Sequence, residues 1–252
     1  MLAVLSPAKK LNFDPMDKDL IQSQPAFHDD ANALAEIARK LSVSDLQKLM
    51  KISEKLASLN KDRFAAFAPV SDEKNAKQAA FAFAGDTYTG LQISNMEADD
   101  VTYAQDHLRI LSGLYGTLKP LDLMQPYRLE MSSRLQNKAG LNLYAYWGDR
   151  IGAALDDAAN GVVINCASHE YFKATGKNMT ARIITPAFKE ERDDDLKMIG
   201  FFAKKARGMM ARFMVLNRIE DPEGLKDFDL EGYKYQPKLS NENDWMFTRK
   251  ST

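Results

Sequence analysis

The sequence contains few of the residues that build covalently linked or metal-stabilised folds. Among 252 residues there is one cysteine, Cys166, and there are three histidines. A single cysteine excludes an internal disulfide framework and a zinc site built from cysteines, and three scattered histidines argue against a histidine-rich metal site. We therefore expect no metal site and no cofactor. The low cysteine content is typical of a protein from the reducing cytoplasm.

Long apolar runs and an excess of flexible residues are also missing. No stretch of about 18 apolar residues occurs, and the most apolar segment, 209–216, is interrupted by Arg212. The N-terminus has no positive region before its apolar run, which ends at Ser6-Pro7, so we expect no signal peptide. The 13 glycines and 9 prolines are too few for a low-complexity chain. The sequence thus predicts a folded cytoplasmic protein without a membrane contact.

The chain lacks an excess of charge of either sign. It has 34 Lys and Arg against 35 Asp and Glu, a formal net charge of -1. Proteins that coat nucleic acid by bulk charge usually have strongly basic domains. Any binding of nucleic acid by this chain must therefore depend on where its charges are placed.

Apolar periodicity divides the chain into strand-like and helix-like segments without a linker or an internal repeat. We expect residues 1–252 to form a single compact domain of the mixed α/β (α+β) class. Strands are predicted at residues 2–5, 81–83, 88–93, 162–166 and 180–185, with a last strand around Trp245 and Phe247. Helices are predicted at residues 29–41, 44–60 with Ser44 as its cap, 100–111, 143–156, 169–174 with Ser168 as its cap, and 196–219. Glycine and proline interrupt residues 114–131, which should form a long, ordered, irregular connection.

The strongest local signal is segment 196–219, which has no acidic residue. Its cations are Lys197, Lys204, Lys205, Arg207, Arg212 and Arg218. On a helix, all of these except Arg218 fall within one arc of roughly 160°. Gly208 lies in this arc, where a missing side chain would let an anionic backbone approach. Most runs of like charge form a solvated surface. Solvated helix faces usually mix positive and negative side chains, however, so we keep two interpretations of this segment: a solvated face and an anion-binding face.

A second signal, in residues 45–59, is similar to a helix-hairpin-helix, in which a tight turn between two helices grips a phosphate. Such turns usually read glycine, apolar, glycine, whereas Lys51 and Ser53 occupy the glycine places here. Ser53 would cap the second helix, and Lys48, Lys51 and Lys55 would contact the phosphate. A plain helical hairpin that packs its leucines into the core fits the spacing at least as well.

Two further segments carry polar residues where α/β proteins often bind ligands. The irregular connection holds Arg128 and Glu130, which would form a buried ion pair or a polar site. At the strand-to-helix junction 165–173, an anion cradle or a catalytic group would come from Asn165, Ser168, Glu170 and Lys173. Cys166 is expected in the core, with a redox role left open.

These segments together resemble the YaaA peroxide-stress protein family. The resemblance is carried by Ser6-Pro-Ala-Lys9 and by residues 49–57, 112–131, 165–173, 202–212, 232–235 and 245–249. It implies a cytoplasmic bacterial protein of the hydrogen-peroxide response that limits free iron and hence Fenton damage to DNA. It further implies a compact mixed α/β fold particular to the family, with DNA bound through a positively charged cleft and a helix-hairpin-helix, carried over onto residues 48–57.

The leading hypothesis is a binding protein, rather than an enzyme, that engages double-stranded or branched DNA with little sequence preference. No recognition helix is present to read bases. The candidate DNA contacts are Lys9, Lys10, Lys48, Lys51, Ser53, Lys55, Lys173, Lys197, Lys204, Lys205, Arg207 and Arg212.

The alternative is an enzyme that acts on a nucleotide or on a base in DNA. Its site would contain Asn165, Ser168, Glu170, Lys173, Arg128 and Glu130. A deep polar cavity beside the basic face would favour this alternative, because enzymes that modify bases must take them into a pocket. Direct iron binding is the weakest hypothesis, because no spacing of His and carboxylate residues supports a site.

Overall fold

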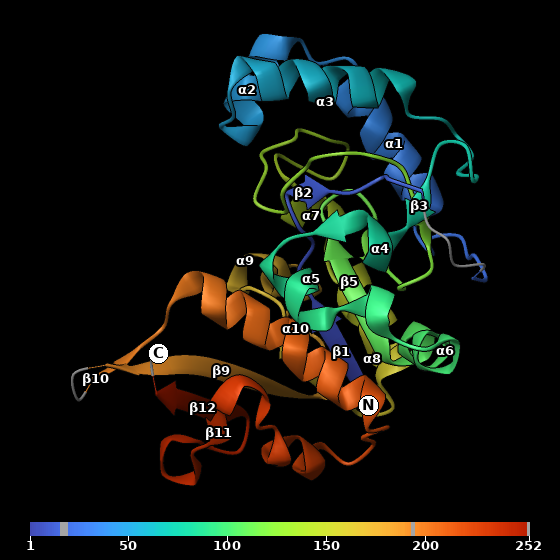
Figure 1. The fold of residues 1–252 in the computed structure, drawn as a ribbon. Helices are drawn as coiled ribbons and strands as arrows, with labels where there is room; N and C mark the ends of the chain where they lie inside the picture. Colours follow the sequence, from blue (N-terminus) through green and yellow to red (C-terminus); the bar gives the residue numbers. More distant parts are fainter. Residues whose placement is uncertain (16–19, 193–194, 251–252) are drawn as a thin grey trace.

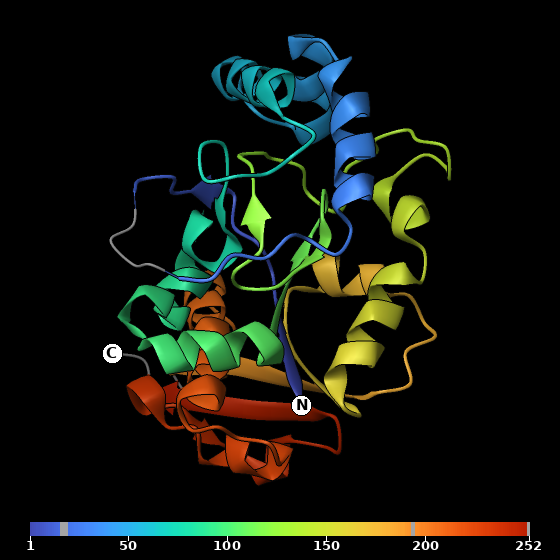
Figure 2. The ribbon, with the colours of Figure 1, turned by 90° about the vertical axis from the view of Figure 1, so that its right-hand side faces the viewer.

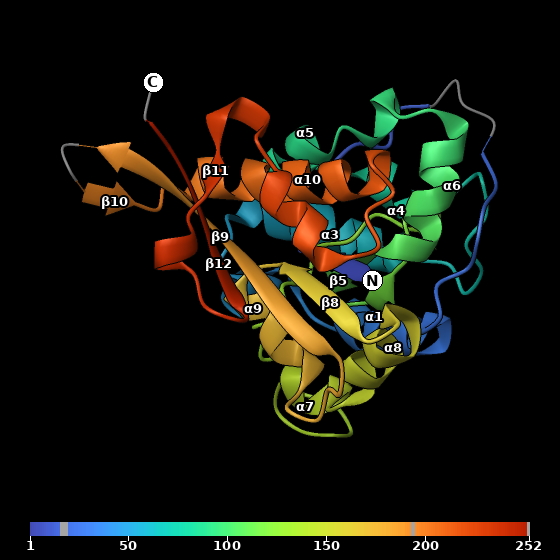
Figure 3. The ribbon, with the colours of Figure 1, turned by 90° about the horizontal axis from the view of Figure 1, so that it is seen from below.

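The computed structural model describes residues 1–15, 20–192 and 195–250. Its centre is a mixed sheet with the strand order β11-β12-β9-β8-β1-β5-β6, and β10 pairs with β9 beside this path. Helices cover both faces of the sheet, and Figure 3 shows α10 and α5 on one side and α7 and α8 on the other. The chain is thus the single compact α/β domain that the sequence predicted.

The middle of the sheet is parallel. β1 (Leu2–Leu5) pairs in parallel with β5 (Leu108–Ser112) on one side and with β8 (Val162–Cys166) on the other. β9 (Arg182–Arg192) follows β8, and β12 (Asp244–Lys250) follows β9, again in parallel. All of β1 and most of β8 is buried. β1 is apolar throughout and β8 is apolar except at Asn165, and such runs are typical of strands covered on both faces, which is why both strands could be predicted from the sequence.

The remaining strands are short. β2 (Lys10–Leu11) pairs with β4 (Phe83–Ala84), and β3 (Lys77–Gln78) pairs with β7 (Leu123–Met124). The strands at the margins of the large sheet are β6 (Gly116–Leu118), β10 (Asp195–Lys197) and β11 (Lys234–Tyr235). The 3-10 turns are η1 (Ile93–Asn95), η2 (Lys173–Thr175), η3 (Pro222–Asp227), η4 (Leu230–Gly232) and η5 (Pro237–Leu239).

The helices divide into a group on the sheet and a group at one end of the molecule. Their bounds are α1 (His28–Arg39), α2 (Val43–Met50), α3 (Glu54–Ala66), α4 (Ala79–Ala82), α5 (Asp86–Leu91), α6 (Ala98–His107), α7 (Leu143–Trp147), α8 (Arg150–Ala159), α9 (His169–Phe172) and α10 (Gly200–Leu216). Figures 1 and 2 both show α1, α2 and α3 at one end, with α10 lower and β2 between them. Among the described residues, no helix is long and apolar enough to cross a bilayer.

Several predicted elements differ from the structure. Residues 81–83 and 88–93, predicted as strands, lie mainly in α4, α5 and η1. Short apolar runs occur in buried short helices as well as in strands, so the apolar pattern did not distinguish the two here. The helix predicted at 100–111 ends at His107, since the apolar run that follows is needed as β5.

Backbone geometry explains other corrections. The helix predicted at 143–156 is divided at Gly148, whose φ of 52° ends α7. The strand predicted at 180–185 continues through Pro186 to Arg192. β9 pairs with β8 only up to Ile184, so Pro186 lies where the strand has a neighbour on one side, and a proline is tolerated there. The predicted helix 196–219 begins only at Gly200, because residues 195–197 pair with β9 as β10.

The α2–α3 hairpin has caps at both helix starts. α2 is capped by Ser42, two residues before the predicted Ser44. The Ser42 hydroxyl accepts a hydrogen bond from the Asp45 backbone N–H at 3.1 Å, and the Asp45 carboxylate accepts one from the Ser42 backbone N–H at 3.1 Å. Lys51 turns the chain with a left-handed φ of 53°. The Ser53 hydroxyl then accepts a hydrogen bond from the Leu56 backbone at 3.4 Å, so the predicted cap of α3 is confirmed.

The two helices α5 and α10 meet backbone to backbone. A Cβ built on Gly208 would overlap the carbonyl oxygen of Thr87, and one built on Gly90 would overlap that of Lys205. Gly208 is buried against α5. The expectation that Gly208 opens α10 to an anionic backbone is therefore wrong, because its missing side chain makes room for a neighbouring helix.

We predict that Gly208→Ala destabilises the fold by about 3 kcal/mol, near the upper end of the usual cost of overpacking. Gly200→Ala is the matched control, since it adds the same methyl group to the same helix with no atom within 4 Å. It should change the free energy of unfolding by less than about 1 kcal/mol. Urea denaturation of both variants measures the difference, and equal midpoints would contradict the close contact.

Candidate functional site

A pocket of about 430 Å³ lies at the carboxyl ends of β1 and β8. Its walls come from stretches far apart in the sequence: residues 6–10, 84–87, 127–130 and 166–171, with part of α10. β1 is also the point from which the strand order runs outward in two directions, toward β5 and toward β8. In open α/β sheets, ligands bind outside the carboxyl ends of the strands at such a switch point.

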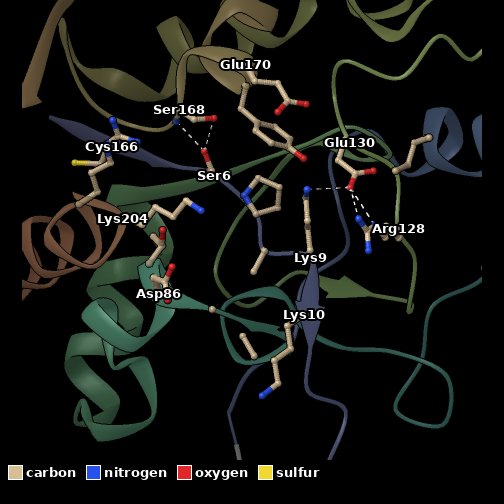
Figure 4. Close-up of a pocket in the computed structure, with 18 of the residues that line it drawn as sticks. Ser6, Lys9, Lys10, Asp86, Arg128, Glu130, Cys166, Ser168, Glu170 and Lys204 are labelled. Carbon is tan, nitrogen blue, oxygen red and sulfur yellow. Dashed lines mark hydrogen bonds and ion pairs between the residues drawn. The ribbon is translucent and has the colours of Figure 1, made fainter. Parts of the chain in front are cut away.

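The pocket brings together candidates from both sequence hypotheses. Of the candidate DNA contacts, Lys9, Lys10, Lys204 and Arg207 line it, and of the candidate enzyme residues, Arg128, Glu130, Ser168 and Glu170 do. Figure 4 shows Lys204 and Cys166 on one side, Glu130 and Arg128 on the other, and Ser6 and Lys9 between them. The two hypotheses therefore concern one place in the fold.

Other candidates lie elsewhere. Lys48, Lys51, Ser53 and Lys55 belong to the α2–α3 hairpin, none of them lines the pocket, and the hairpin's role in DNA binding stays a prediction. Lys173 is exposed, with its Nζ 5.1 Å from the centre of the Tyr144 ring. Asn165 is buried and donates to Thr185 Oγ1 at 3.4 Å on β9.

Much of the charge in segment 196–219 is neutralised by residues from outside it. Lys205 pairs with Glu231, and Arg218 pairs with Asp100 at 2.6 Å. Lys197 pairs with Asp195 at 3.8 Å on β10, and Arg212 donates to Gln92. Sequence periodicity cannot show Glu231, Asp100 and Gln92 as partners, because they lie far from this segment along the chain. Lys204 and Arg207 are the cations of α10 that face the pocket.

Arg207 is a half-buried cation on the pocket wall. In the part of the chain that the structure describes, its guanidinium makes no hydrogen bond or ion pair. Burial lowers the pKa of Arg207, and the nearby Cys166 acts in the opposite direction. A guanidinium has five N–H donors and stays protonated in proteins, so an unpaired and partly desolvated one is a strong site for an anion.

Glu130 lies on the opposite wall, and within the described part of the chain only one of its two carboxylate oxygens has hydrogen-bond partners. Its Oε1 atom accepts from Arg128 Nε at 3.0 Å and Arg128 Nη2 at 2.9 Å, and Lys9 Nζ is 3.8 Å away. Its Oε2 atom is buried and has no hydrogen-bond donor among the described residues. Buried polar atoms without a partner are rare in native folds, and this one belongs to a residue that lines the pocket.

Hydrogen bonds join the loops that carry the pocket. Ser168 N donates to Ser6 Oγ at 2.8 Å, and the Ser168 hydroxyl lies 3.3 Å from the same atom. Ser168 therefore does not cap α9 with its side chain, contrary to the prediction, because that hydroxyl faces β1. Glu170 Oε1 accepts from Ser132 N at 3.0 Å and from its hydroxyl at 2.8 Å, which holds residue 132 and the neighbouring Glu130 segment in place.

Sequence reasoning missed part of the pocket. Ser6, Asp86, Tyr127 and Tyr171 line it and were not among the candidates. The signal for Ser6 was present, since it ends an apolar strand run directly before a proline. Nothing in the sequence shows that Tyr127 and Tyr171 share a wall. Among the described residues, no group of three or more His, Cys, Asp and Glu side chains is arranged to hold a metal ion.

Fold and site together define an α/β protein whose pocket, lined in part by charged side chains, lies at the switch point of a central parallel sheet. The chain belongs to the peroxide stress protein YaaA family, whose model matches residues 1–239. The family resemblance is thereby confirmed, and with it a place among proteins named for the peroxide stress response.

Similar proteins cover almost the whole chain. A UPF0246 protein of Dinoroseobacter shibae is 52% identical over 257 residues, spanning 99% of this chain and 95% of the relative. One of Alteromonas mediterranea is 51% identical over 254 residues, with 99% and 98% covered. One of Roseobacter denitrificans is 50% identical over 256 residues, again with 99% and 98% covered.

We predict that Cys166 does not react with hydrogen peroxide in the folded protein. Burial raises the pKa of its thiol to about 12, against the opposing charge of Arg207. Fewer than about one thiol in 10,000 is then the reactive thiolate at pH 7.5. Mass spectrometry should find no added oxygen and no alkylation by iodoacetamide, whereas protein unfolded in urea should be alkylated fully. Rapid oxidation of the native protein would show that Cys166 is a sensor.

Proposed function

We propose that this peroxide-stress protein binds DNA with little sequence preference and protects it from damage by hydrogen peroxide and iron. The observation that carries the proposal is the gathering of Lys9, Lys10 and Lys204 around one pocket. Lys10 and Lys204 are exposed and have no ion pair among the described residues, and Lys9 is 71% exposed. Exposed lysines around a cavity are suited to contact phosphates, which supply most of the affinity in non-specific binding.

The α2–α3 hairpin is the proposed second contact. Lys51 and Lys55 are exposed at its turn, and the Ser53 backbone starts a helix there. Leu46 is buried, but Leu56 is 39% exposed, so the hairpin does not bury its whole apolar face in the core. Figures 1 and 2 place β2, with Lys10, between this hairpin and α10. DNA that touches both regions would lie along this side of the molecule.

An enzyme that acts on a nucleotide or a base is the second candidate. One observation favours it: the cations line a pocket of about 430 Å³ rather than a flat surface. Glu130, Arg128 and Ser168 would then be the groups nearest the substrate. We keep this candidate behind DNA binding, because Arg128 and Ser168 are already engaged with protein partners.

We predict that Lys10→Gln combined with Lys204→Gln weakens binding to a fully paired DNA duplex. The slope of log affinity against log salt should become less steep by about 2, because each phosphate contact contributes about 1. Lys234→Gln with Lys238→Gln is the matched control, since it removes the same charge from exposed positions that do not line the pocket. Fluorescence anisotropy at several salt concentrations measures both slopes. An unchanged slope in the Lys10→Gln, Lys204→Gln variant would show that these two lysines do not contact DNA phosphates.

The hairpin contributes a separate prediction. Lys51→Gln with Lys55→Gln should also lower the salt slope by about 2, and the four substitutions together by about 4. The two pairs add because they act on different phosphates. If the hairpin pair leaves the slope unchanged while the pocket pair lowers it, the hairpin is a structural element only. Circular dichroism of each variant checks that α2 and α3 are retained.

A further inference from the structure

We propose that the pocket binds a single nucleotide, either free or turned out of a DNA strand. The phosphate lies against Lys204 and Arg207, and the base lies against Glu130 and Lys9. The DNA form of this proposal rests on the proposed function, whereas the free-nucleotide form does not.

The size of the pocket fits this ligand class. Its volume of about 430 Å³ lies within the range of small-molecule sites, roughly 300–1,000 Å³. A lone phosphate would leave most of that space unfilled, and a base pair in a duplex cannot enter a pocket of this size. A nucleotide in DNA must therefore leave the base stack before it binds here.

One wall is suited to a phosphate. Lys204 and Arg207 lie three residues apart, so they share a face of α10. Neither side chain has an ion-pair partner among the residues that the structure describes. Figure 4 shows the Lys204 side chain extending from α10 into the pocket. The other cations of this helix segment are paired or bonded, so the protein leaves two free donors at this one position.

The opposite wall is suited to a base. Glu130 Oε2 is a buried acceptor without a donor, and Lys9, whose Nζ is 3.8 Å from Oε1, is a donor beside it. Each base carries N–H groups next to acceptor atoms on its edges. A base edge can therefore donate to Glu130 and accept from Lys9 at the same time. Tyr127 and Tyr171 also line the pocket and offer aromatic surface to the ring.

The first experiment uses the intact protein and free ligands. Calorimetry compares the four 2′-deoxynucleoside 5′-monophosphates with 2-deoxyribose 5-phosphate, which has the phosphate and no base. At least one nucleotide should bind about tenfold more tightly than the sugar phosphate, the gain expected from one charged hydrogen bond. Equal affinities for the nucleotides and the sugar phosphate would show that the pocket recognises only the phosphate. No binding of any of these ligands would show that the pocket does not bind nucleotides. Either result overturns the proposal.

Variants separate the two walls. Glu130→Gln puts an amide donor in place of the Oε2 acceptor, so it should abolish the preference for the nucleotide and leave sugar-phosphate affinity unchanged. Arg207→Met should weaken both ligands about equally, by about tenfold. Lys238→Gln, outside the pocket, is the control and should change neither. Thermal melting checks each fold; should Glu130→Gln melt early, the comparison of ligands on the unchanged protein still decides the proposal.

The second experiment distinguishes a free nucleotide from one in DNA. Anisotropy compares a paired duplex, the same duplex with one bulged nucleotide, and that bulge without its base. A nucleotide turned out of DNA predicts tighter binding to the bulge with its base, and Glu130→Gln should remove that difference but retain affinity for the paired duplex.

The two proposals fail in different ways. Binding of the paired duplex without any preference for a nucleotide or a bulged base overturns the pocket assignment and leaves the DNA-binding function intact. Glu130-dependent binding of a nucleotide without binding of any duplex overturns the DNA-binding function and supports the pocket in its free-nucleotide form.

Discussion

The close contact between α5 and α10 is the constraint on which the rest of the structure depends. Gly90 and Gly208 let the two backbones approach to a distance that a methyl group would prevent. Because α10 also packs on β1, β8 and β9, this contact fixes where the helix crosses the sheet. That position brings Lys204 and Arg207 to the carboxyl end of β1. Two glycines thus decide which cations reach the pocket.

Parallel pairing completes the site. Ser6 and Ser168 are 162 residues apart, yet they form hydrogen bonds because β1 and β8 run side by side in the same direction. The loops after these strands therefore meet, and the segment with Arg128 and Glu130 closes the opposite wall. A half-satisfied buried carboxylate thus faces unpaired cations across a small space, where electrostatic interactions are stronger than in water.

Much of the fold could be predicted from the residues alone, for physical reasons that also explain the errors. β1 is apolar at every position and β8 at every position except Asn165, a pattern typical of strands covered on both faces. Residues 81–93 were mispredicted because helices this short are stabilised by their neighbours and not by their own period. The candidates Arg128, Glu130, Ser168 and Glu170 line one pocket, and that shared position depends on strand order, which periodicity does not contain.

The sequence by itself determined the family, the mixed α/β class and the location of an acid-free basic segment, since these depend on residue identity and spacing along the chain. Only the tertiary structure decided what that segment does. It supplied Glu231 to Lys205 and Asp100 to Arg218, placed Gly208 against a helix, and left Arg207 without an anion among the described residues. Whether a charge is neutralised depends on its neighbours in space, and these come from parts of the chain that are distant in sequence.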